Sequence, residues 1–458
     1  MAASAFANNP VPTVVGPPVP QAVVPGSGAF TLKVYGANFV SGAVVNWNRS
    51  PRSTMFISAR ELQAQILASD VATATAGYIT VTNPPPGGGV SSSSFGLVEV
   101  HTPTSTIVVK RPHAYLRNVG SQRLVLGDYN NDGILDFAAD YSFSEIKILL
   151  GNGDGTFRSG PIATHNYYGS GPAAIASGDF NNDGNEDLAF GADPNGPPTQ
   201  LQVSLGNGDG KFRLGSRSGH FDVYPFAIVA GDYNGDGKLD AIALEGGIYV
   251  FLGNGDGTFR RPLYDANVPG YDFVSADFNG DGILDLAILR ETEIEILLGN
   301  GDGTFRLRTI SIPQDFGCGF GPPILVTDFN ADGKADLAYC ERDQNNGKIW
   351  VLLGNGDGTF KKPVSYPIKN GLYSFSFAAG DFNSDGNTDL VVSYITFNSS
   401  VFELLLGKGD GTFQKPKSVN LHAVYNAEEG IVVGDFNSDG LLDFIFQQPG
   451  DVSVFTQK

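Results

Sequence analysis

The sequence predicts an all-β protein, in which a seven-bladed β-propeller follows a smaller β-sandwich. Two observations predict the propeller. A nine-residue pattern recurs seven times, and a glycine-rich pattern follows six of these copies. Short apolar runs of strand length, bounded by Gly and Asn, separate the two patterns. A repeat of about 50 residues with four such runs is typical of a propeller blade.

Composition limits the class of protein. The 458 residues include 60 Gly and 27 Pro, and aromatic residues make up 11%. This balance favours many turns around an apolar core over collagen or disorder. The net charge of −19 argues against nucleic acid or an anionic membrane as the main partner. We expect no transmembrane segment, because no apolar stretch reaches about 18 residues. Residues 1–6 show no secretion signal.

The chain divides into four parts by pattern. We expect a tail over 1–9, a β-sandwich over 10–101, a linker over 102–105 and the propeller over 106–458. The sandwich region lacks both repeated patterns and shows short strand-like runs between turns. These runs are Phe30–Val34, Ala43–Trp47, Leu62–Ile66, Tyr78–Thr82 and Phe95–Val100.

The nine-residue pattern is Asp-x-Asn-x-Asp-Gly-x-x-Asp, with no departure in any copy. Successive copies lie 45 to 54 residues apart and begin at Asp128, Asp179, Asp232, Asp277, Asp328, Asp381 and Asp435. An apolar run precedes each copy and a second one follows it. A third run leads to the glycine-rich pattern, and a fourth, often basic, comes after it, as at Arg260–Pro262 and Lys361–Pro363. Four antiparallel strands per repeat are predicted.

The last repeat lacks a fourth strand, because the chain stops at Lys458 after the run Val452–Phe455. A matching segment, Val108–Pro112, precedes the first repeat and aligns with Thr359–Pro363. We expect this N-terminal strand to complete the seventh blade. Such an exchange joins the two chain ends and closes a ring.

The nine-residue pattern has the chemistry of a calcium loop. Calcium binds six to eight oxygen ligands, and positions 1, 3, 5 and 9 of the loop supply carboxylate or amide oxygens. A main-chain carbonyl at position 7 adds another, and Gly at position 6 permits a positive φ. The predicted ligands are Asp128, Asn130, Asp132, Ile134 and Asp136; Asp179, Asn181, Asp183, Asn185 and Asp187; Asp232, Asn234, Asp236, Lys238 and Asp240; Asp277, Asn279, Asp281, Ile283 and Asp285; Asp328, Asn330, Asp332, Lys334 and Asp336; Asp381, Asn383, Asp385, Asn387 and Asp389; and Asp435, Asn437, Asp439, Leu441 and Asp443.

An EF-hand and a metal-free turn would each account for only part of this pattern. An EF-hand closes with Glu at position 12 between helices, whereas here the ninth-position Asp opens a strand. Metal-free Asx turns account for Asn and Gly but not for three carboxylates, which repel one another without a cation. We therefore expect about seven Ca²⁺ ions with a structural role.

The glycine-rich pattern, Gly-x-Gly-Asp-Gly-x-Phe, predicts the turn between the third and fourth strands. Its Asp is expected to cap the turn. Its Phe is expected to pack between blades. The residues are Phe157, Phe212, Phe259, Phe305, Phe360 and Phe413. Phosphate binding is not expected, because neither a helix nor Lys-Ser/Thr follows.

Together these motifs resemble the FG-GAP/VCBS-type repeat of integrin-α-like propellers, over residues 105–458. The resemblance implies calcium binding and extracellular use more than any single activity. The first domain resembles the IPT/TIG immunoglobulin-like domain through Val34-x-Gly-x-Asn-Phe39, Val45-x-Trp47 and Val81–Pro84. Such domains act as spacers or binding modules.

Strand alternation places both motifs on one rim and the irregular loops on the other. We expect ligand recognition on the irregular rim, where aromatic side chains could stack on sugars or anchor a protein. The alternative is that these aromatics only cap blade ends. The candidates are Tyr167, Tyr168, His220, Tyr224, Tyr271, Phe316, Phe320, Tyr373 and Tyr425.

The sequence predicts a secreted or cell-surface recognition protein, not an enzyme, with a carbohydrate or extracellular protein as ligand. A polysaccharide lyase or dehydratase, with loop histidines as bases, is the first alternative, although no catalytic motif is present. A structural matrix protein is the second. Cys318 and Cys340 flank the inner hairpin of the fifth repeat and could form one disulfide.

Overall fold

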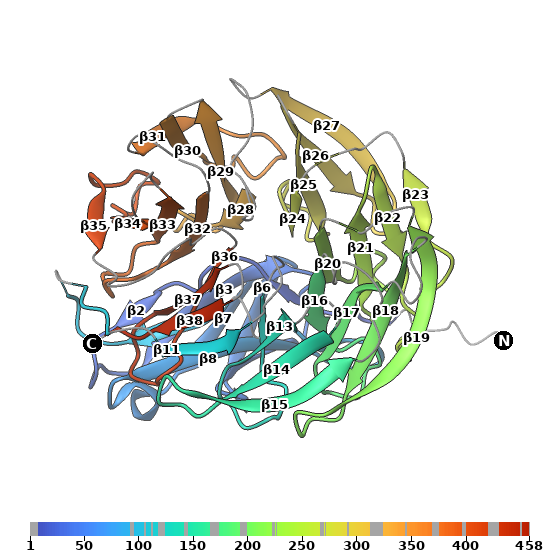
Figure 1. Cartoon of the computed structure of the whole chain (residues 1–458), viewed down its shortest axis with the longest axis horizontal. Helices are drawn as coiled ribbons and strands as arrows, with labels where there is room; N and C mark the ends of the chain where they lie inside the picture. The colour runs from blue at the N-terminus through green and yellow to red at the C-terminus, as the bar shows by residue number, and fades with distance from the viewer. Residues whose placement is uncertain are drawn as a thin grey trace.

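The computed structural model describes residues 8–457 except 92–95, 105–106, 111–112, 118–123, 142–144, 165–173, 193–198, 222–224, 226, 266–269, 271, 291–292, 312–323, 344–345, 369–374, 396–399, 420–429 and 449–450. Nearly all regular structure in these residues is β-strand, arranged as a ring of sheets with a smaller unit on one side (Figure 1). Across the described part of the chain, no helix is both long and apolar enough for a membrane crossing.

The N-terminal unit is built from two sheets that enclose one core. The first sheet has the order β1-β3-β7-β6, and the second has the order β2-β10-β8-β4-β5, with β9 beside β8. The strands are β1 (Thr13–Val14), β2 (Ala22–Val23), β3 (Phe30–Ala37), β4 (Val44–Trp47), β5 (Ser50–Pro51), β6 (Thr54–Ser58), β7 (Glu61–Ile66), β8 (Thr75–Asn83), β9 (Gly89–Val90) and β10 (Leu97–Val100), with a 3₁₀ turn, η1, at Ala68–Val71.

Period-2 alternation forms this core. In β7 the residues Leu62, Ala64 and Ile66 are fully buried, and Trp47 packs into the same cluster from β4. The sequence prediction missed β6, because Met55, Phe56 and Ile57 are all exposed and the strand shows no alternation. The two-residue strands β1, β2, β5 and β9 were not predicted either. The five predicted runs overlap β3, β4, β7, β8 and β10, with ends shifted by a few residues, and Phe95 lies outside the described residues.

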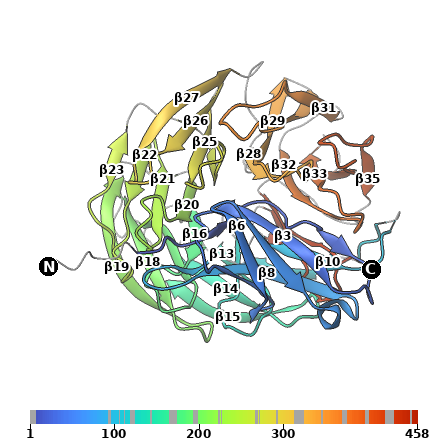
Figure 2. The ribbon, with the colours of Figure 1, turned by 180° about the vertical axis from the view of Figure 1, so that it is seen from behind.

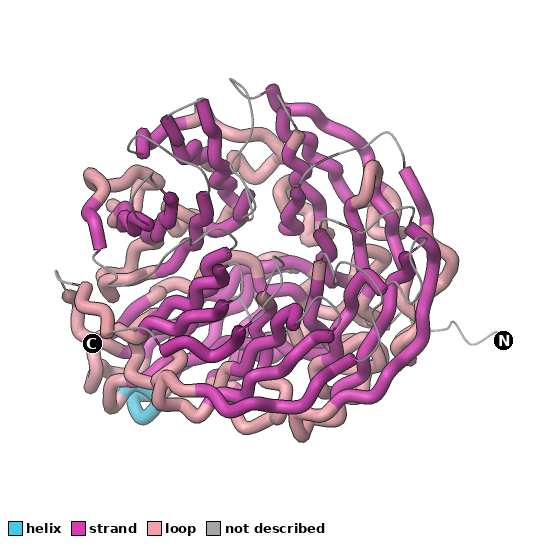
Figure 3. Tube along the Cα trace, viewed as in Figure 1, coloured by secondary structure: helices cyan, strands magenta, loops and turns pink. Residues whose placement is uncertain are grey.

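The rest of the chain forms seven four-stranded antiparallel sheets. We number them one to seven along the ring (Figures 1 and 3). Sheet one contains β12 (Val125–Gly127), β13 (Asp136–Tyr141), β14 (Glu145–Gly151) and β15 (Phe157–Thr164); sheet two contains β16 (Ile175–Gly178), β17 (Asp187–Ala192), β18 (Thr199–Gly206) and β19 (Phe212–Phe221); sheet three contains β20 (Ala227–Gly231), β21 (Asp240–Leu244), β22 (Ile248–Phe251) and β23 (Leu263–Asp265); sheet four contains β24 (Asp272–Ala276), β25 (Asp285–Leu289), β26 (Glu293–Gly299) and β27 (Phe305–Ser311).

The remaining three sheets follow the same plan. Sheet five contains β28 (Ile324–Thr327), β29 (Asp336–Asp343), β30 (Asn346–Leu352) and β31 (Val364–Ile368); sheet six contains β32 (Phe375–Gly380), β33 (Asp389–Ile395), β34 (Ser400–Leu405) and β35 (Lys417–Val419); sheet seven contains β36 (Gly430–Gly434), β37 (Asp443–Gln448), β38 (Asp451–Phe455) and β11 (His113–Arg117). In sheets three and five the fourth strand begins just after the basic triplets predicted to form it, because each triplet ends in Pro, which has no N–H to donate.

Sheet seven joins the two ends of the ring. Strand β11 pairs antiparallel with β38, and upstream of it Val109 bridges Gln457. The predicted pairing of an N-terminal strand with the last repeat is therefore observed. Most of the ladder lies just beyond the predicted segment Val108–Pro112, in β11 itself.

Apolar packing holds neighbouring sheets together. Each of seven buried clusters draws side chains from two adjacent sheets, including the cluster that joins sheet seven to sheet one through Phe436, Val452, Leu135 and Phe137. A core that lies between sheets favours closure, since an open ring would expose two apolar faces.

The N-terminal unit lies across one rim of the ring. Figure 2 shows β3, β6, β8 and β10 in front of the ring on the side turned away in Figure 1. The segment 102–104 then leads toward the ring, and the Thr104 N–H donates to the Asn383 carbonyl at 2.9 Å.

Candidate functional site

The seven nine-residue copies all form the same tight loop on one rim. We call them loops one to seven, over residues 128–136, 179–187, 232–240, 277–285, 328–336, 381–389 and 435–443. The structure thus brings the five predicted ligand positions of each copy into one turn and keeps the seven copies apart.

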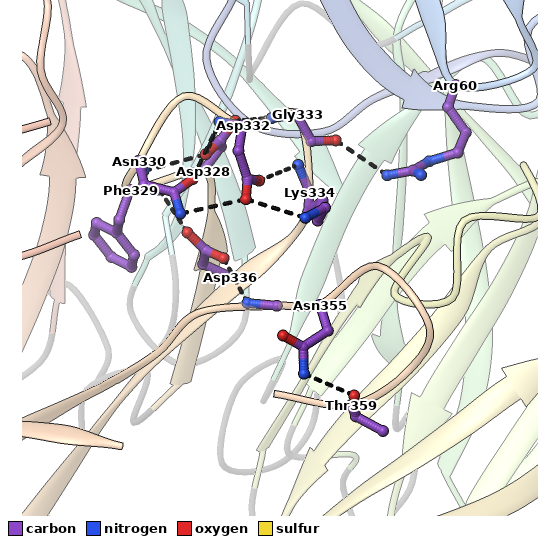
Figure 4. A network of polar contacts seen from close by, with 11 residues as sticks. Arg60, Asp328, Phe329, Asn330, Asp332, Gly333, Lys334, Asp336, Asn355 and Thr359 are labelled. Carbon is purple, nitrogen blue, oxygen red and sulfur yellow. Dashed lines mark hydrogen bonds and ion pairs between the residues drawn. The ribbon is translucent and has the colours of Figure 1, made fainter. Parts of the chain in front are cut away.

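Loop five illustrates the internal bonding (Figure 4). The carboxylate of Asp328 accepts the N–H groups of Gly333 at 2.7 Å and Asp332 at 3.2 Å. The Asn330 amide oxygen also accepts the Asp332 N–H, and the Asp332 carboxylate accepts the Lys334 N–H at 3.1 Å. Side-chain oxygens at positions 1, 3 and 5 therefore turn inward toward the main chain of the loop.

The ninth-position aspartate ties the loop to the sheet. Asp336 is fully buried and accepts the N–H of Phe329 at 2.9 Å and that of Gly354, at the end of the third strand, at 2.7 Å. All seven copies repeat this pair of bonds, through Asp136, Asp187, Asp240, Asp285, Asp336, Asp389 and Asp443.

Each loop contains two residues with positive φ. One is the Gly at position 6, as predicted, with φ between 78° and 88°. The other, at position 4, was not predicted from the sequence. It is Asn in loops one and two and Gly in loops three and four, but Ala331, Ser384 and Ser438 in loops five to seven, with φ of 55° to 58°. A side chain there carries backbone strain.

Burial and neighbouring negative charge raise the pKa of the ninth-position aspartates. In loop three, burial raises the pKa of Asp240 to about 8, and the nearby charges of Asp232 and Asp236 add to the rise. The same causes raise the pKa of the other ninth-position aspartates, to about 7 for Asp136, Asp285 and Asp336 and to about 8 for Asp187, Asp389 and Asp443. Each loop concentrates negative charge where water cannot reach it fully.

The donor set of a loop fits a hard divalent cation. Each carboxylate oxygen has two acceptor sites, so its bonds to N–H groups leave capacity for a metal. In loop three the Oδ1 atom of Asp236 is buried without a hydrogen-bond partner, which a cation would supply. Among the described residues, no three acidic, His or Cys side chains alone form a metal cage. The ligand set would be mixed, with amide and main-chain oxygens, as calcium accepts.

The glycine-rich turns have the predicted roles. In sheet one the Asp154 carboxylate accepts the Thr156 N–H at 2.9 Å and so caps the turn. The Phe of each turn packs against the aromatic residue at position 2 of the neighbouring loop, with ring centroids 5.6 to 6.0 Å apart. In sheet one this pair is Phe157 with Phe436 of loop seven, and the Gly155 N–H donates to the Phe436 carbonyl at 2.9 Å. Both motifs therefore share one rim and link successive sheets.

The N-terminal unit covers the rim that carries both motifs, which we call the motif rim. No motif in the sequence predicted this contact. Arg60 pairs with Asp277 of loop four at 3.1 Å and donates to the Gly333 carbonyl of loop five at 3.0 Å. Arg49 pairs with Asp128 of loop one, and the Val11 N–H donates to Asp232 of loop three at 2.9 Å.

Loops six and seven are reached by other groups. Ser384 of loop six donates to the carboxylate of Glu99, which is buried in β10, and this burial raises the pKa of Glu99 well above its usual value. The Tyr78 hydroxyl donates to the Asp435 carbonyl of loop seven at 2.7 Å. Because of this cover, six of the seven first-position aspartates are buried. Asp179 of loop two is the exception and is only half-buried.

A cavity of about 410 Å³ lies between the N-terminal unit and the ring, beside loops one and two. Asn46, Thr80 and Thr82 line it from the N-terminal unit. Asp179 and Asn185 line it from loop two, and Asp128 and Leu135 line it from loop one. The sequence carried no signal for this cavity, because residues far apart in the chain form it, such as Asn46 and Asp179.

Most of the candidate ligand-face aromatics lie outside the described residues, namely Tyr167, Tyr168, Tyr224, Tyr271, Phe316, Phe320, Tyr373 and Tyr425. His220 falls in β19, but its side chain is not among those described. Cys340 is buried in β29 and forms a disulfide. Cys318, the second cysteine in the sequence, lies outside the described residues.

Comparison with known proteins agrees with the repeats. The FG-GAP-like repeat family matches residues 128–190, 187–243, 241–288, 277–339, 328–392 and 394–446, which is more than half of the chain. Integrin alpha-PS3 of Drosophila melanogaster is 26% identical over 161 residues, covering 31% of this chain and 14% of that protein. Integrin alpha pat-2 of Caenorhabditis briggsae is 26% identical over 182 residues, covering 33% of this chain and 15% of that protein. The chain therefore spans a small part of the length of these relatives.

Solved structures resemble the fold at low sequence identity. BBS1N, solved in complex with ARL6DN, has a TM-score of 0.50 and 11% identity, with 76% of this chain and 96% of that chain covered. An Agrocybe aegerita protein described as recognising non-reducing terminal N-acetylglucosamine has a TM-score of 0.47 and 16% identity, with 90% and 98% covered. The repeated loops, the ring of four-stranded sheets and the match over the repeats lead to one assignment: the chain belongs to the FG-GAP-like repeat family.

Proposed function

We propose that this protein is a calcium-stabilised recognition protein that acts outside the cell. One observation carries the proposal: seven loops share one sequence pattern and one pair of bonds to the ninth-position Asp, and each places three aspartates and an Asn within one nine-residue turn. A bound cation would neutralise the negative charge of those carboxylates, while hydrogen bonds within the loop maintain its conformation. Seven similar sites favour a structural role over seven catalytic ones.

The metal proposal is tested by elemental analysis and chelation. The purified protein should contain about seven calcium ions per chain. EDTA should lower its melting temperature by many degrees, and added Ca²⁺ should restore it. A folded protein without divalent ions, whose melting EDTA leaves unchanged, would contradict the proposal.

The finer fold follows from the same repeats. We take the seven sheets to be the blades of a closed seven-bladed β-propeller, with β11 completing the last blade. The seven inter-sheet clusters support this closure. We take the N-terminal unit to be an immunoglobulin-like domain of the IPT/TIG type, a view supported by its two sheets around Trp47.

We assign the main ligand face to the rim opposite the motifs. The cover of the motif rim supports this choice, because the N-terminal unit already contacts loops there. A carbohydrate or an extracellular protein would bind the aromatic residues of the irregular loops. A glycan array and a pull-down with extracellular proteins would test this, with Tyr167→Ala and Tyr373→Ala expected to weaken binding.

We further propose that the protein binds its ligand without turnover and is secreted or held at a cell surface. The likeness to two integrin alpha proteins supports recognition outside the cell. Assay against uronate polysaccharides discriminates the enzyme alternative, since release of unsaturated products would identify a lyase. Self-assembly of the pure protein into filaments would instead favour a matrix role.

A further inference from the structure

The seven loops have the same sequence pattern but unequal surroundings. Groups of the N-terminal unit contact Asp128, Asp232 and Asp277 directly. Six first-position aspartates are at most 8% exposed, whereas Asp179 of loop two is half-buried and faces the cavity between the two units. Loop one also borders the cavity, but there Arg49 pairs with Asp128 and covers it. An ion in loop two would therefore be more open than one in loop one to a small molecule in the cavity.

The opposite wall of the cavity is a row of uncharged polar groups. The Asn46 amide donates to the Thr82 hydroxyl at 3.0 Å and more weakly to the Thr80 hydroxyl at 3.3 Å. Each hydroxyl still has a hydrogen to donate, and the Asn46 carbonyl oxygen is an acceptor. Leu135 and Leu239 add apolar surface to the lining. Paired donors and acceptors beside an apolar patch suit a sugar ring, which has hydroxyl edges and a C–H face.

Charge selects among oxygen-rich ligands. The lining holds the carboxylates of Asp128, Asp179 and Glu186 but one guanidinium, that of Arg49, which pairs with Asp128. Calcium ions in loops one and two would offset part of this charge, but the six aspartates of those loops, Glu186 and Arg49 would still leave a net charge of −2. This charge would repel an anionic ligand but not a neutral sugar. The volume of about 410 Å³ is at the small end of the range for ligand pockets, which fits one or two sugar rings.

From this geometry we infer that the cavity at loop two binds a neutral mono- or disaccharide, with two neighbouring sugar hydroxyls directed at the loop-two cation. The inference rests on the proposed calcium loops, and it adds a second binding place apart from the irregular rim. Asp179, Asp183 and Asn185 would hold the ion, while Asn46, Thr80 and Thr82 would orient the sugar.

The test compares two loops in the full chain. Asp183 and Asp281 both occupy position 5, are exposed, and accept the N–H of position 7 at 2.9 Å. Calcium-loaded wild type, Asp183→Asn and Asp281→Asn are titrated with a panel of methyl glycosides by calorimetry and saturation-transfer NMR. We expect Asp183→Asn to weaken sugar binding about tenfold or more, and Asp281→Asn to change it less than about twofold.

A third variant tests the far wall of the cavity without touching the loop. Thr80→Val should weaken sugar binding several-fold while the calcium content and melting temperature stay at wild-type values. Calcium-loaded protein that binds no glycoside of the panel, or binding that Asp183→Asn leaves intact, would overturn the inference. Equal losses in both loop variants would overturn it as well. The proposed function would survive each of these results if elemental analysis still finds calcium, and would fail if it finds none.

Discussion

The buried ninth-position aspartate offers a stability test whose size follows from two hydrogen bonds. Asp336→Ala removes the acceptor of the Phe329 and Gly354 N–H groups, both of which are buried (Figure 4). A buried donor without a partner costs about 1–3 kcal/mol, so the pair costs about 2–6 kcal/mol. Unfolding entropy of about 2.1 cal/mol/K per residue converts 1 kcal/mol to about 1 °C in a chain of 458 residues.

Differential scanning calorimetry in Ca²⁺ should therefore show Asp336→Ala melting about 2–6 °C below wild type, before any loss of bound ion is added. The control is Asp256→Ala in a glycine-rich turn. Asp256 also accepts an N–H, from Thr258 at 3.0 Å, but water can replace it there because the turn is exposed. Its melting temperature should stay near the wild-type value. If Asp336→Ala and Asp256→Ala melt together, the buried-acceptor argument is wrong.

Three further perturbations test the backbone, the charges and the domain cover. Gly235 and Ala331 both occupy position 4 of their loops with positive φ. In urea unfolding, Gly235→Ala should therefore lower the free energy of unfolding by about 1 kcal/mol and Ala331→Gly should raise it by about 1 kcal/mol. Changes of the same sign in the two variants would refute the strain assignment. The pKa of Asp240 is raised to about 8 in the fold, so the metal-free folded protein keeps a proton that the unfolded chain releases near pH 4. Its stability should therefore fall as pH rises from about 5 to 8, and the melting increment from Ca²⁺ should grow over the same window; an increment that shrinks would contradict this. Arg60→Ala should speed proteolysis at residues 102–104 more than Arg49→Ala does, because Arg60 is the more buried of the two; the reverse order would show that Arg60 does not fasten the cover.

Local chemistry explains why much of the fold was predictable from the sequence. Each loop is closed by bonds between residues at most nine positions apart, as from Gly333 to Asp328 and from Phe329 to Asp336. The repeat therefore specifies the loop, the strand that follows it and the rim on which it lies. The aromatic seams were predictable as well, since one Phe recurs at a fixed distance from each glycine-rich turn.

Several features left no local pattern. The left-handed conformation at position 4 could not be predicted, because Ala331, Ser384 and Ser438 occupy this position in three loops and such residues rarely adopt a positive φ. The contact of Arg60 with Asp277 and that of Ser384 with Glu99 join residues more than 200 positions apart. Such pairs become visible only after both units are folded and docked.

The docked N-terminal unit changes what identical repeats can do. A pattern that recurs without variation implies equal sites, and seven equal sites leave no reason for a ligand to choose among them. The cover removes this equality, because a guanidinium meets loop four, a tyrosine hydroxyl meets loop seven and a cavity opens at loop two. Ligand charge and site rigidity set calcium affinity, so these loops should differ in how tightly they hold an ion. The differences in calcium affinity among the loops are thus expected to arise from contacts between the two units, which the repeated sequence pattern does not predict.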